Sequence, residues 1–174
     1  MKKRLLLLKP LSILPALALL WLIFRFSAQT GEESGDLSYA VSLWLVSCWD
    51  SLLCRGASGA ELAAHAGAIH LFVRKAAHMT EYCLLGWSVS LPCFAYQAKG
   101  RLRVPLTLLL CTAAAALDEY HQSFVAGRGP SLRDVGIDCA GVLIGLILLQ
   151  LALLLVRRRR RRKTAFAICA LIGI

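Results

Sequence analysis

The longest apolar run of the chain, residues 135–156, constrains its fold more than any other feature. Only Asp138 and Gln150 interrupt this run. About 20 apolar residues match the roughly 30 Å hydrocarbon layer of a bilayer, and a soluble protein of 174 residues can bury a core without such a run. The chain is also 58% hydrophobic, above the roughly 45–50% of an average soluble domain. The sequence therefore indicates an integral membrane protein.

Three earlier segments complete a set of four predicted spans. They cover residues 5–24, 76–98 and 104–120, and the second carries polar residues in its first half. We therefore predict an all-α fold, an integral membrane bundle of four transmembrane helices. The last stretch, 164–174, is apolar but too short to cross alone. We expect it to lie at the interface or in a partner's groove.

The first predicted span also resembles a secretory signal, because KKR precedes its apolar core and SAQ follows it. Against cleavage stand Lys9, Arg25, two prolines and a weak small-residue site. We expect the segment to be retained as a membrane helix.

The basic residues predict the orientation of the spans. With a cytoplasmic N-terminus, most of the 20 Lys and Arg residues fall inside and all ten acids fall outside. The positive-inside rule then places both termini in the cytoplasm. The run RRRRRRK, 157–163, would anchor the cytoplasmic end of the last span. We therefore divide the chain into a membrane domain, 5–156, and a basic cytoplasmic tail, 157–174, and we expect no nucleic-acid partner despite the net charge of +10.

The long outer segment between the first two spans, 27–71, is expected to be helical in part. Its middle, VSLWLVSCWDSLLC, has helical spacing of apolar groups and carries Trp44 and Trp49. This pattern predicts an interfacial helix with its tryptophans at headgroup level. Its end is helix-compatible and leads directly into the second span. Cys48 and Cys54 share the outer side, so a disulfide is possible but not required.

The predicted orientation brings polar groups of all four spans to the outer face. FSAQT closes the first span, RKAAHMTEY opens the second, DEYHQ closes the third and RDVGID opens the fourth. Polar groups at membrane depth usually face the bundle interior or a water-filled cavity, and they usually pair. Four helix ends in an up-down bundle can bring such groups together. We therefore predict a polar pocket that opens outward.

Within three of these segments, polar residues recur three or four positions apart and so share one helix face. We expect an arginine to pair with an aspartate, and a histidine to pair with a carboxylate. The shared faces are Arg74, His78 and Glu81 with Tyr82; Asp118, His121 and Gln122; and Asp134 with Asp138. The candidate pairs join Arg74 or Arg133 with Asp118 or Asp134, and His78 or His121 with any nearby carboxylate.

Three interpretations of this cluster remain open. In the first, the cluster is structural, and its hydrogen bonds and ion pairs hold the helix ends together. A polar cavity would bind or process a headgroup, because histidines beside carboxylates can do acid–base work near neutral pH. A metal site would need ligands, but no HExxH or cysteine-pair spacing supports one, and we predict no metal and no cofactor. The candidates for catalysis and for metal ligation are the same four residues: His78, Glu81, Asp118 and His121.

No nucleophile motif accompanies these residues, since the sequence contains neither GxSxG nor a Walker loop. Ser131 directly precedes a predicted helix and is expected to cap its N-terminus. The preceding turn AGRGP carries Arg128. This arginine could clamp a phosphate or anchor the loop among lipid headgroups.

Three motifs in this order resemble the VanZ-like family of small bacterial integral membrane proteins. They are FSAQTGEES (26–34), VRKAAHMTEYCLLG (73–86) and DEYHQSFVAGRGPSLRDVGIDCAGVLIG (118–145). The resemblance implies the bacterial cell membrane and, through the family's founding member, an association with teicoplanin-type glycopeptide resistance. The Cys- and Trp-bearing outer segment and the arginine tail depart from the family's pattern. The matching residues are Ser27, Gln29, Arg74, Lys75, His78, Glu81, Tyr82, Asp118, Glu119, His121, Gln122, Arg128 and Asp134.

Three functional hypotheses follow. The protein binds an envelope lipid or a phosphate-bearing envelope component; or it is a hydrolase or transferase acting on a lipid-linked substrate; or the polar cluster is purely structural. In the enzyme, His121 or His78 would be the general base, a carboxylate would orient it, and an arginine, Arg128 or Arg133, would hold phosphate. The expected partners are membrane lipids and possible lipid-linked components. The candidate ligand-binding residues are Ser27, Gln29, Arg74, Lys75, Tyr82, Glu119, Gln122, Arg128, Arg133 and Asp134.

Overall fold

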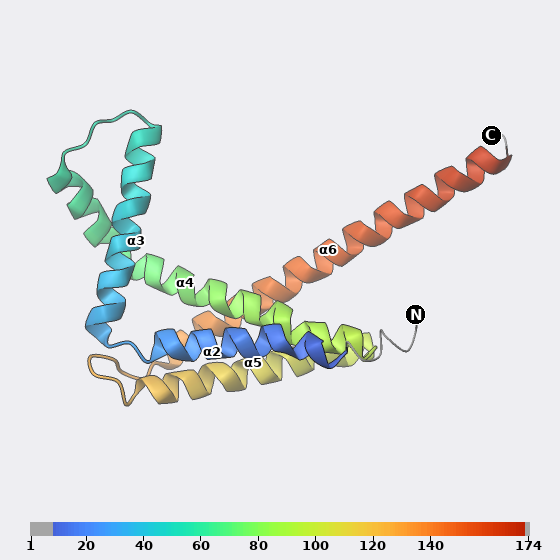
Figure 1. The fold of residues 1–174 in the computed structure, drawn as a ribbon, viewed down its shortest axis with the longest axis horizontal. Helices are drawn as coiled ribbons and strands as arrows, with labels where there is room; N and C mark the ends of the chain where they lie inside the picture. The colour runs from blue at the N-terminus through green and yellow to red at the C-terminus, as the bar shows by residue number, and fades with distance from the viewer. Residues whose placement is uncertain (1–8, 173–174) are drawn as a thin grey trace.

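The computed structural model describes the backbone of residues 9–172 and the side chains of residues 9–159 and 162. This part of the chain contains helices and connecting turns but no strand, so the all-α prediction is confirmed (Figure 1). The elements are η1 (Pro10–Ile13), α2 (Leu14–Ser27), α3 (Gly31–Leu52), α4 (Gly59–Ala95), α5 (Gly100–Gln122) and α6 (Leu132–Ile172).

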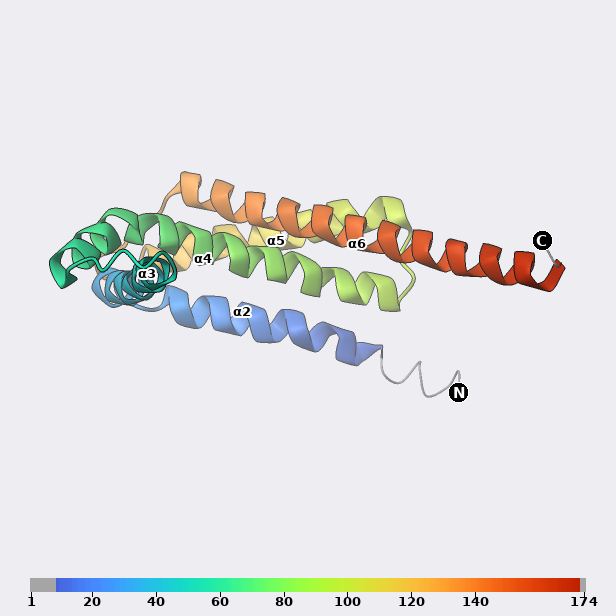
Figure 2. The ribbon, with the colours of Figure 1, turned by 90° about the horizontal axis from the view of Figure 1, so that it is seen from above.

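The helices form a bundle and a hairpin that stands across it. α2, α5, the second half of α4 and the first half of α6 lie side by side, while α3 and the start of α4 project from one end as the hairpin (Figures 1 and 2). α4 is unbroken, as expected for an outer segment that leads directly into a span. η1 and the end of α6 lie at the end of the bundle away from the hairpin.

Three helical stretches are long and apolar enough to cross a membrane. They are Pro10–Ser27, Gly100–Gln122 and Leu132–Arg159. The predicted second span, 76–98, lies within the bundle as part of α4 and the turn after it, but α4 does not join this set. The polar residues in α4 lower its mean hydropathy, although its second half is apolar. The structure thus supports three membrane-crossing helices by composition where the sequence predicted four.

Helix boundaries also differ from the predicted ones. The third predicted span, 104–120, looked short, and α5 extends it at both ends to Gly100–Gln122. α6 continues through the arginine run, so its backbone has no break between the predicted domains 5–156 and 157–174; that division stays a prediction. The expected placement of 164–174 at an interface or in a groove concerns side chains outside the described residues.

α4 and α6 pack with their backbones in close contact. A Cβ atom added at Gly141 would lie 2.3 Å from the carbonyl oxygen of Met79, and one added at Gly145 would lie 2.4 Å from that of Cys83. The Trp87 indole N–H donates a hydrogen bond to the Gly145 carbonyl. Two glycines four positions apart are typical of close helix contacts in membranes. The stretch GVLIG carries this signal, which the sequence interpretation missed.

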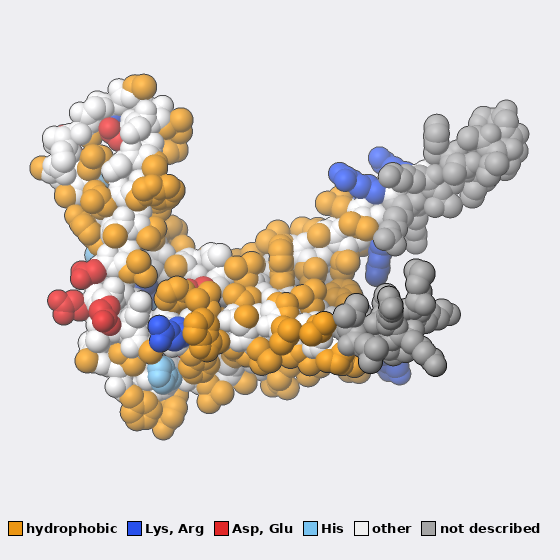
Figure 3. All heavy atoms as spheres, viewed as in Figure 1, with side chains coloured by type: hydrophobic (Ala, Val, Ile, Leu, Met, Phe, Trp, Pro, Cys, Tyr) orange, Lys and Arg blue, Asp and Glu red, His pale blue; other side chains and the backbone are white. Residues whose placement is uncertain are grey.

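Apolar side chains lie both inside and outside the bundle. The buried core contains Ile23, Tyr82, Leu85, Cys111, Ala115, Val142 and Leu146. Many leucines and isoleucines remain exposed along the same helices, and hydrophobic side chains cover the visible surface of the bundle (Figure 3). Acidic side chains gather beside the base of the hairpin, and Lys and Arg side chains gather towards the far end of α6. An apolar exterior between charged ends fits a surface in contact with lipid.

α3 confirms the helix predicted in the outer segment and has an inverted polarity. Ser34, Ser38 and Ser42 are buried at four-residue spacing, whereas Trp44 is 64% exposed. Apolar side chains thus face outward while small polar side chains face α4. Cys48 and Cys54 are free thiols, so the possible disulfide is absent from this structure.

Candidate functional site

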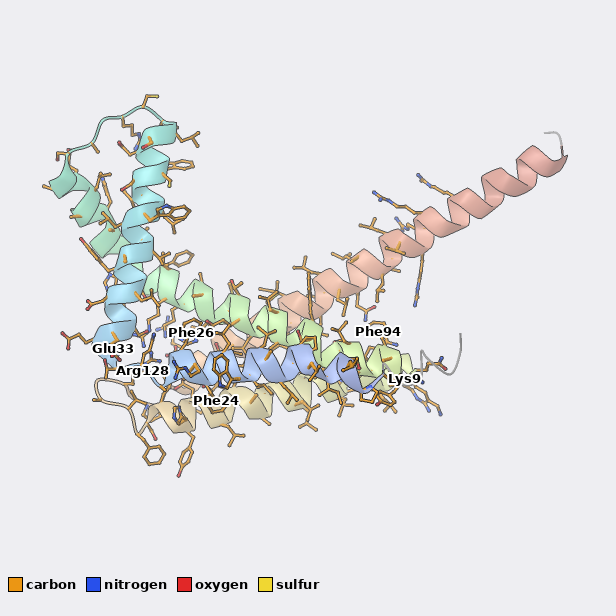
Figure 4. All side chains as sticks on the ribbon, viewed as in Figure 1. Lys9, Phe24, Phe26, Glu33, Phe94 and Arg128 are labelled. Carbon is orange, nitrogen blue, oxygen red and sulfur yellow. The ribbon has the colours of Figure 1, made fainter. Side chains whose placement is uncertain are left out.

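Polar residues gather where the hairpin meets the bundle. The end of α2, the start of α3, the middle of α4, the α5–α6 loop and the start of α6 meet there. Figure 4 shows Arg128 near Phe26 and Glu33 at this end of the molecule, with Lys9 and Phe94 at the other. The predicted convergence of the helix ends is therefore present, and two cavities lie within it.

The first, here called the polar cavity, has a volume of about 220 Å³. It lies between α4, the end of α5, the loop after it and α6. Six charged side chains line it, three of each sign: Arg74, Lys75, Arg128, Glu119, Asp134 and Asp138.

Two of the carboxylates already have partners. The Lys75 ammonium group binds the Asp134 carboxylate in a partly exposed ion pair. The Ser131 backbone N–H donates to Glu119 Oε2 at 2.8 Å. The Asp134 backbone N–H donates to Ser131 Oγ at 3.4 Å, so the predicted N-cap is confirmed.

The predicted arginine–aspartate pairs are wrong. Among the described side chains, neither Arg74 nor Arg133 forms an ion pair, and Lys75 takes the aspartate instead. Arg74 lines the polar cavity, whereas Arg133 lines neither of the two cavities. Adjacent residues on a helix point about 100° apart, so the rotation of α4 about its axis decides which one faces α6.

Arg128 is held in place by two hydrogen bonds. One terminal nitrogen, Nη1, donates to Gln122 Oε1 at 2.9 Å, and the other, Nη2, donates to the Phe26 carbonyl oxygen at 3.2 Å. Burial lowers the pKa of Arg128, and the nearby Arg74 guanidinium lowers it further by charge repulsion. Two like charges therefore lie close together in a partly buried wall, where an anion would relieve their repulsion.

The loop that carries Arg128 touches the start of α3 through two glycines. The Gly31 N–H donates to the Ala126 carbonyl at 3.0 Å. Gly127 has a positive φ of 72°, which glycine adopts without strain. A Cβ at Gly31 would lie 2.2 Å from the Gly127 carbonyl oxygen. This contact leaves no space for a side chain at Gly31.

Buried polar groups of three helices lie close to the cavities. Asp118 is 0% exposed, and its Oδ2 accepts a hydrogen bond from Gln122 Nε2 at 2.9 Å. Among the described residues, the Asp118 Oδ1, the Ser27 Oγ and the Tyr82 hydroxyl have no hydrogen-bond partner of ordinary geometry. Ser27 lies beside the Asp118 carboxyl. The cluster thus brings polar atoms of α2, α4 and α5 together inside the bundle.

The two candidate histidines lie in different surroundings. His78 lines the cavities, and its Nδ1 lies 3.6 Å from Glu81 Oε2, which confirms the predicted histidine–carboxylate contact. His121 lines neither cavity and packs against Phe24, with ring centroids 5.7 Å apart. No group of three His, Cys, Asp or Glu side chains able to hold a metal ion occurs among the described residues. The four candidate ligands therefore do not form the metal site that was considered.

The second, here called the apolar cavity, has a volume of about 210 Å³ and lies between α2, α3 and α4. The charged residues Arg74 and Arg128 and the histidine His78 line both cavities. Gln29, predicted as a site residue, also lines the apolar one. The apolar wall, which the sequence interpretation missed, consists of Phe26, Leu37, Val41, Val73 and Ala77. The four-residue spacing of Leu37 and Val41 was the available signal.

A larger hollow, of about 840 Å³, lies within the hairpin between α3 and the start of α4. Trp49, Asp50 and His65 are among its lining residues. None of the predicted site residues reaches it, so it is separate from the charged cluster.

Three helices apolar enough to cross a bilayer, with charged residues gathered at one end, are consistent with a multi-pass membrane protein. Residues 12–157 match the family model of VanZ/LLP1 proteins. The match covers most of the chain, so the protein belongs to this family, and the VanZ-like resemblance of its motifs is confirmed. No curated protein and no solved structure matches the chain.

Proposed function

We propose that the protein crosses the bacterial cell membrane four times, with both termini in the cytoplasm and the polar cavity at the outer surface. The second half of α4 lies among the three apolar helices, which supports a fourth crossing. Lys9 and Arg103 lie towards the end of the bundle away from the hairpin, where they contact Tyr96 and Phe94. The positive-inside rule counts Lys and Arg near the ends of spans, so these residues support a cytoplasmic placement of that end.

In this arrangement the polar cavity binds a phosphate-bearing component of the cell envelope, either a lipid or a lipid-linked molecule. The observation that carries the proposal is the pair of arginines in the shared wall, Arg74 and Arg128. Arg74 has no hydrogen-bond or ion-pair partner among the described residues, and Arg128 is oriented by Gln122 and Phe26. Guanidinium groups bind phosphate oxygens through paired, charge-assisted hydrogen bonds.

Three carboxylates line the polar cavity and a fourth, Glu81, lines the apolar one, but two of the four are already engaged. Asp134 is engaged by Lys75, and Glu119 accepts from the Ser131 backbone. Asp138 is the remaining carboxylate of the cavity and is almost fully buried. By holding an envelope component at the outer surface, the protein would contribute to teicoplanin-type resistance, as the family's founding member suggests.

A catalytic role is the second candidate, favoured by the 3.6 Å contact between His78 and Glu81 at the cavity wall. His78 would then act as the general base on a water molecule, with Glu81 orienting it. His121 does not share this position, because it packs on Phe24 outside both cavities.

The test compares Arg74→Gln and Arg128→Gln with Arg133→Gln, a control that removes a neighbouring positive charge outside both cavities. Each full-length variant is purified from membranes and titrated with inorganic phosphate. We expect the two cavity variants to bind phosphate at least roughly tenfold more weakly, equivalent to about 1.4 kcal/mol, and the control to bind like wild type. Equal binding by all three would contradict an arginine-lined phosphate site.

The same variants are expressed in bacteria that lack other copies of the family. We expect the cavity variants to keep normal membrane abundance and to lose protection against teicoplanin. Lost abundance would instead support the structural interpretation. Release of free phosphate from a lipid phosphate, abolished by His78→Gln, would favour the catalytic candidate.

A further inference from the structure

We infer that the ligand is a phosphate-bearing lipid whose phosphate lies between Arg74 and Arg128 and whose hydrocarbon chain occupies the apolar cavity. This inference rests on the proposed phosphate site and specifies the class of molecule that fills it. The inference distinguishes two ligands: a lipid phosphate would occupy both cavities, whereas a free phosphate ion would need only the polar cavity.

The first support is the shared wall. The polar and apolar cavities lie on either side of Arg74, His78 and Arg128. Beside these three residues the apolar cavity presents mainly apolar side chains, and its other polar residues are Gln29, Ser34, Ser38 and Glu81. A mainly apolar wall offers water or a simple ion few hydrogen-bond partners. An amphiphile satisfies both sides, because its anionic group meets the arginines while its chain contacts the apolar wall.

The second support is size. The cavities measure about 220 and 210 Å³. Each is smaller than the roughly 300–1,000 Å³ typical of small-molecule sites, whereas their combined volume falls within that range. A ligand that uses both cavities is therefore a better match than one that uses either.

The third support is the surface on which the apolar cavity opens. Phe26, Leu37 and Val41 line it and remain 36%, 48% and 41% exposed. Two of these, Leu37 and Val41, lie on α3 beside the buried Ser34 and Ser38, which line the same cavity. The cavity thus opens among apolar side chains where the hairpin meets the bundle, which is the level of the lipid headgroups if the bundle crosses the membrane. A lipid could reach it sideways from the bilayer.

The test uses full-length protein in dodecyl maltoside, a detergent without phosphate, with dioleoyl phosphatidic acid and inorganic phosphate as alternative probes. Ala77→Phe fills the apolar cavity without changing any charge. Ala68→Phe is the matched control, because Ala68 is also exposed on α4 but lines none of the cavities. We expect Ala77→Phe to weaken phosphatidic acid binding at least roughly tenfold and to leave inorganic phosphate binding unchanged. The control should bind both probes like wild type.

A second variant covers the case in which Ala77→Phe is not produced as a folded protein. Val41→Ser makes the cavity wall polar, and Leu52→Ser is its control on an exposed position of α3 that lines no cavity. We expect only Val41→Ser to weaken phosphatidic acid binding. If both cavity variants bind phosphatidic acid like wild type, the lipid inference is wrong. If wild type binds inorganic phosphate but not phosphatidic acid, the lipid inference is also wrong, but the proposed phosphate site stands. If wild type binds neither probe, the proposed function fails as well.

Discussion

Glycines bring two backbones together at two places: where α4 packs on α6, and where the hairpin joins the bundle. The two contacts have different consequences. In the bundle, Gly141 and Gly145 let two long helices touch among apolar side chains. At the junction, Gly31 touches Gly127, which lies in a loop next to Arg128. The first contact closes space, whereas the second holds a loop beside two cavities.

The difference shows how stability and function are divided along the molecule. The α4–α6 contact has no space for added side-chain atoms, because protein interiors are close-packed. The junction keeps charged side chains and two cavities together, an arrangement typical of binding sites. Substitutions in the first region should therefore alter folding, and substitutions in the second should alter binding.

The largest effect is expected from Gly141→Ala. Its Cβ would meet the Met79 carbonyl oxygen at 2.3 Å, and two packed helices cannot separate locally. We expect a loss of about 1–3 kcal/mol, the usual effect of overpacking, measured as a lower thermal unfolding temperature in detergent and a lower membrane abundance.

The matched control is Gly136→Ala, on the same helix with no atom within 4 Å of the added Cβ. It should be neutral or slightly stabilising, since alanine favours a helix by about 1 kcal/mol over glycine. If the two variants unfold at the same temperature, the close α4–α6 contact is not a determinant of stability.

Compared with Gly141→Ala, we expect Gly31→Ala to lower stability less and to weaken phosphate binding more. The added Cβ would lie 2.2 Å from the Gly127 carbonyl oxygen. A loop can move further than a packed helix, so the loop would shift and carry Arg128 away from Arg74. We expect weaker inorganic phosphate binding by the purified variant, with an unfolding temperature closer to wild type than that of Gly141→Ala.

Gly35→Ala is the control, because nothing lies within 4 Å of its added Cβ in α3. It should bind phosphate like wild type. Weak binding by both variants would point to a general effect on α3 rather than to the contact with Gly127.

The two regions also differ in how far the sequence predicts them. Hydrophobicity and helical period are local properties, and they sufficed to predict the helices, three of the four apolar spans, the clustering of polar helix ends and the Ser131 cap. They could not identify the partner of Asp134, because Lys75 and Arg74 are neighbours in sequence. The contact of α4 with Gly141 and Gly145 fixes the rotation of α4, and so places Lys75 towards Asp134.

The apolar cavity was beyond prediction for a related reason. Its wall combines Phe26 from α2, Val41 from α3 and Ala77 from α4. Each residue alone looks like ordinary packing, and only the angle between the hairpin and the bundle brings them together. That angle depends on contacts between residues far apart in the sequence, including Gly31 with Gly127.

The smallest effect is expected at the exposed start of α3. Glu33 accepts hydrogen bonds from the Thr30 N–H at 2.8 Å and the Thr30 hydroxyl at 3.1 Å, and the backbone bond is the main cause that lowers the pKa of Glu33. A lowered pKa means that this capping box stabilises the helix above pH about 4.3, the ordinary value for glutamate, and loses its contribution as the pH falls further.

Amide hydrogen exchange in the first turn of α3, corrected for intrinsic rates, measures this contribution. We expect protection of the Glu33 and Ser34 amides to fall between pH 5 and pH 3 in the wild type, because protonation turns the charged carboxylate into a weaker, neutral acceptor. Glu33→Gln should flatten that dependence, while the neighbouring control Glu32→Gln should retain it. Since this turn lies at the surface beside the site, phosphate binding near neutral pH should be the same in all three proteins. If amide protection in Glu33→Gln still falls with pH, another group titrates, and the capping box is not the cause of the pH dependence.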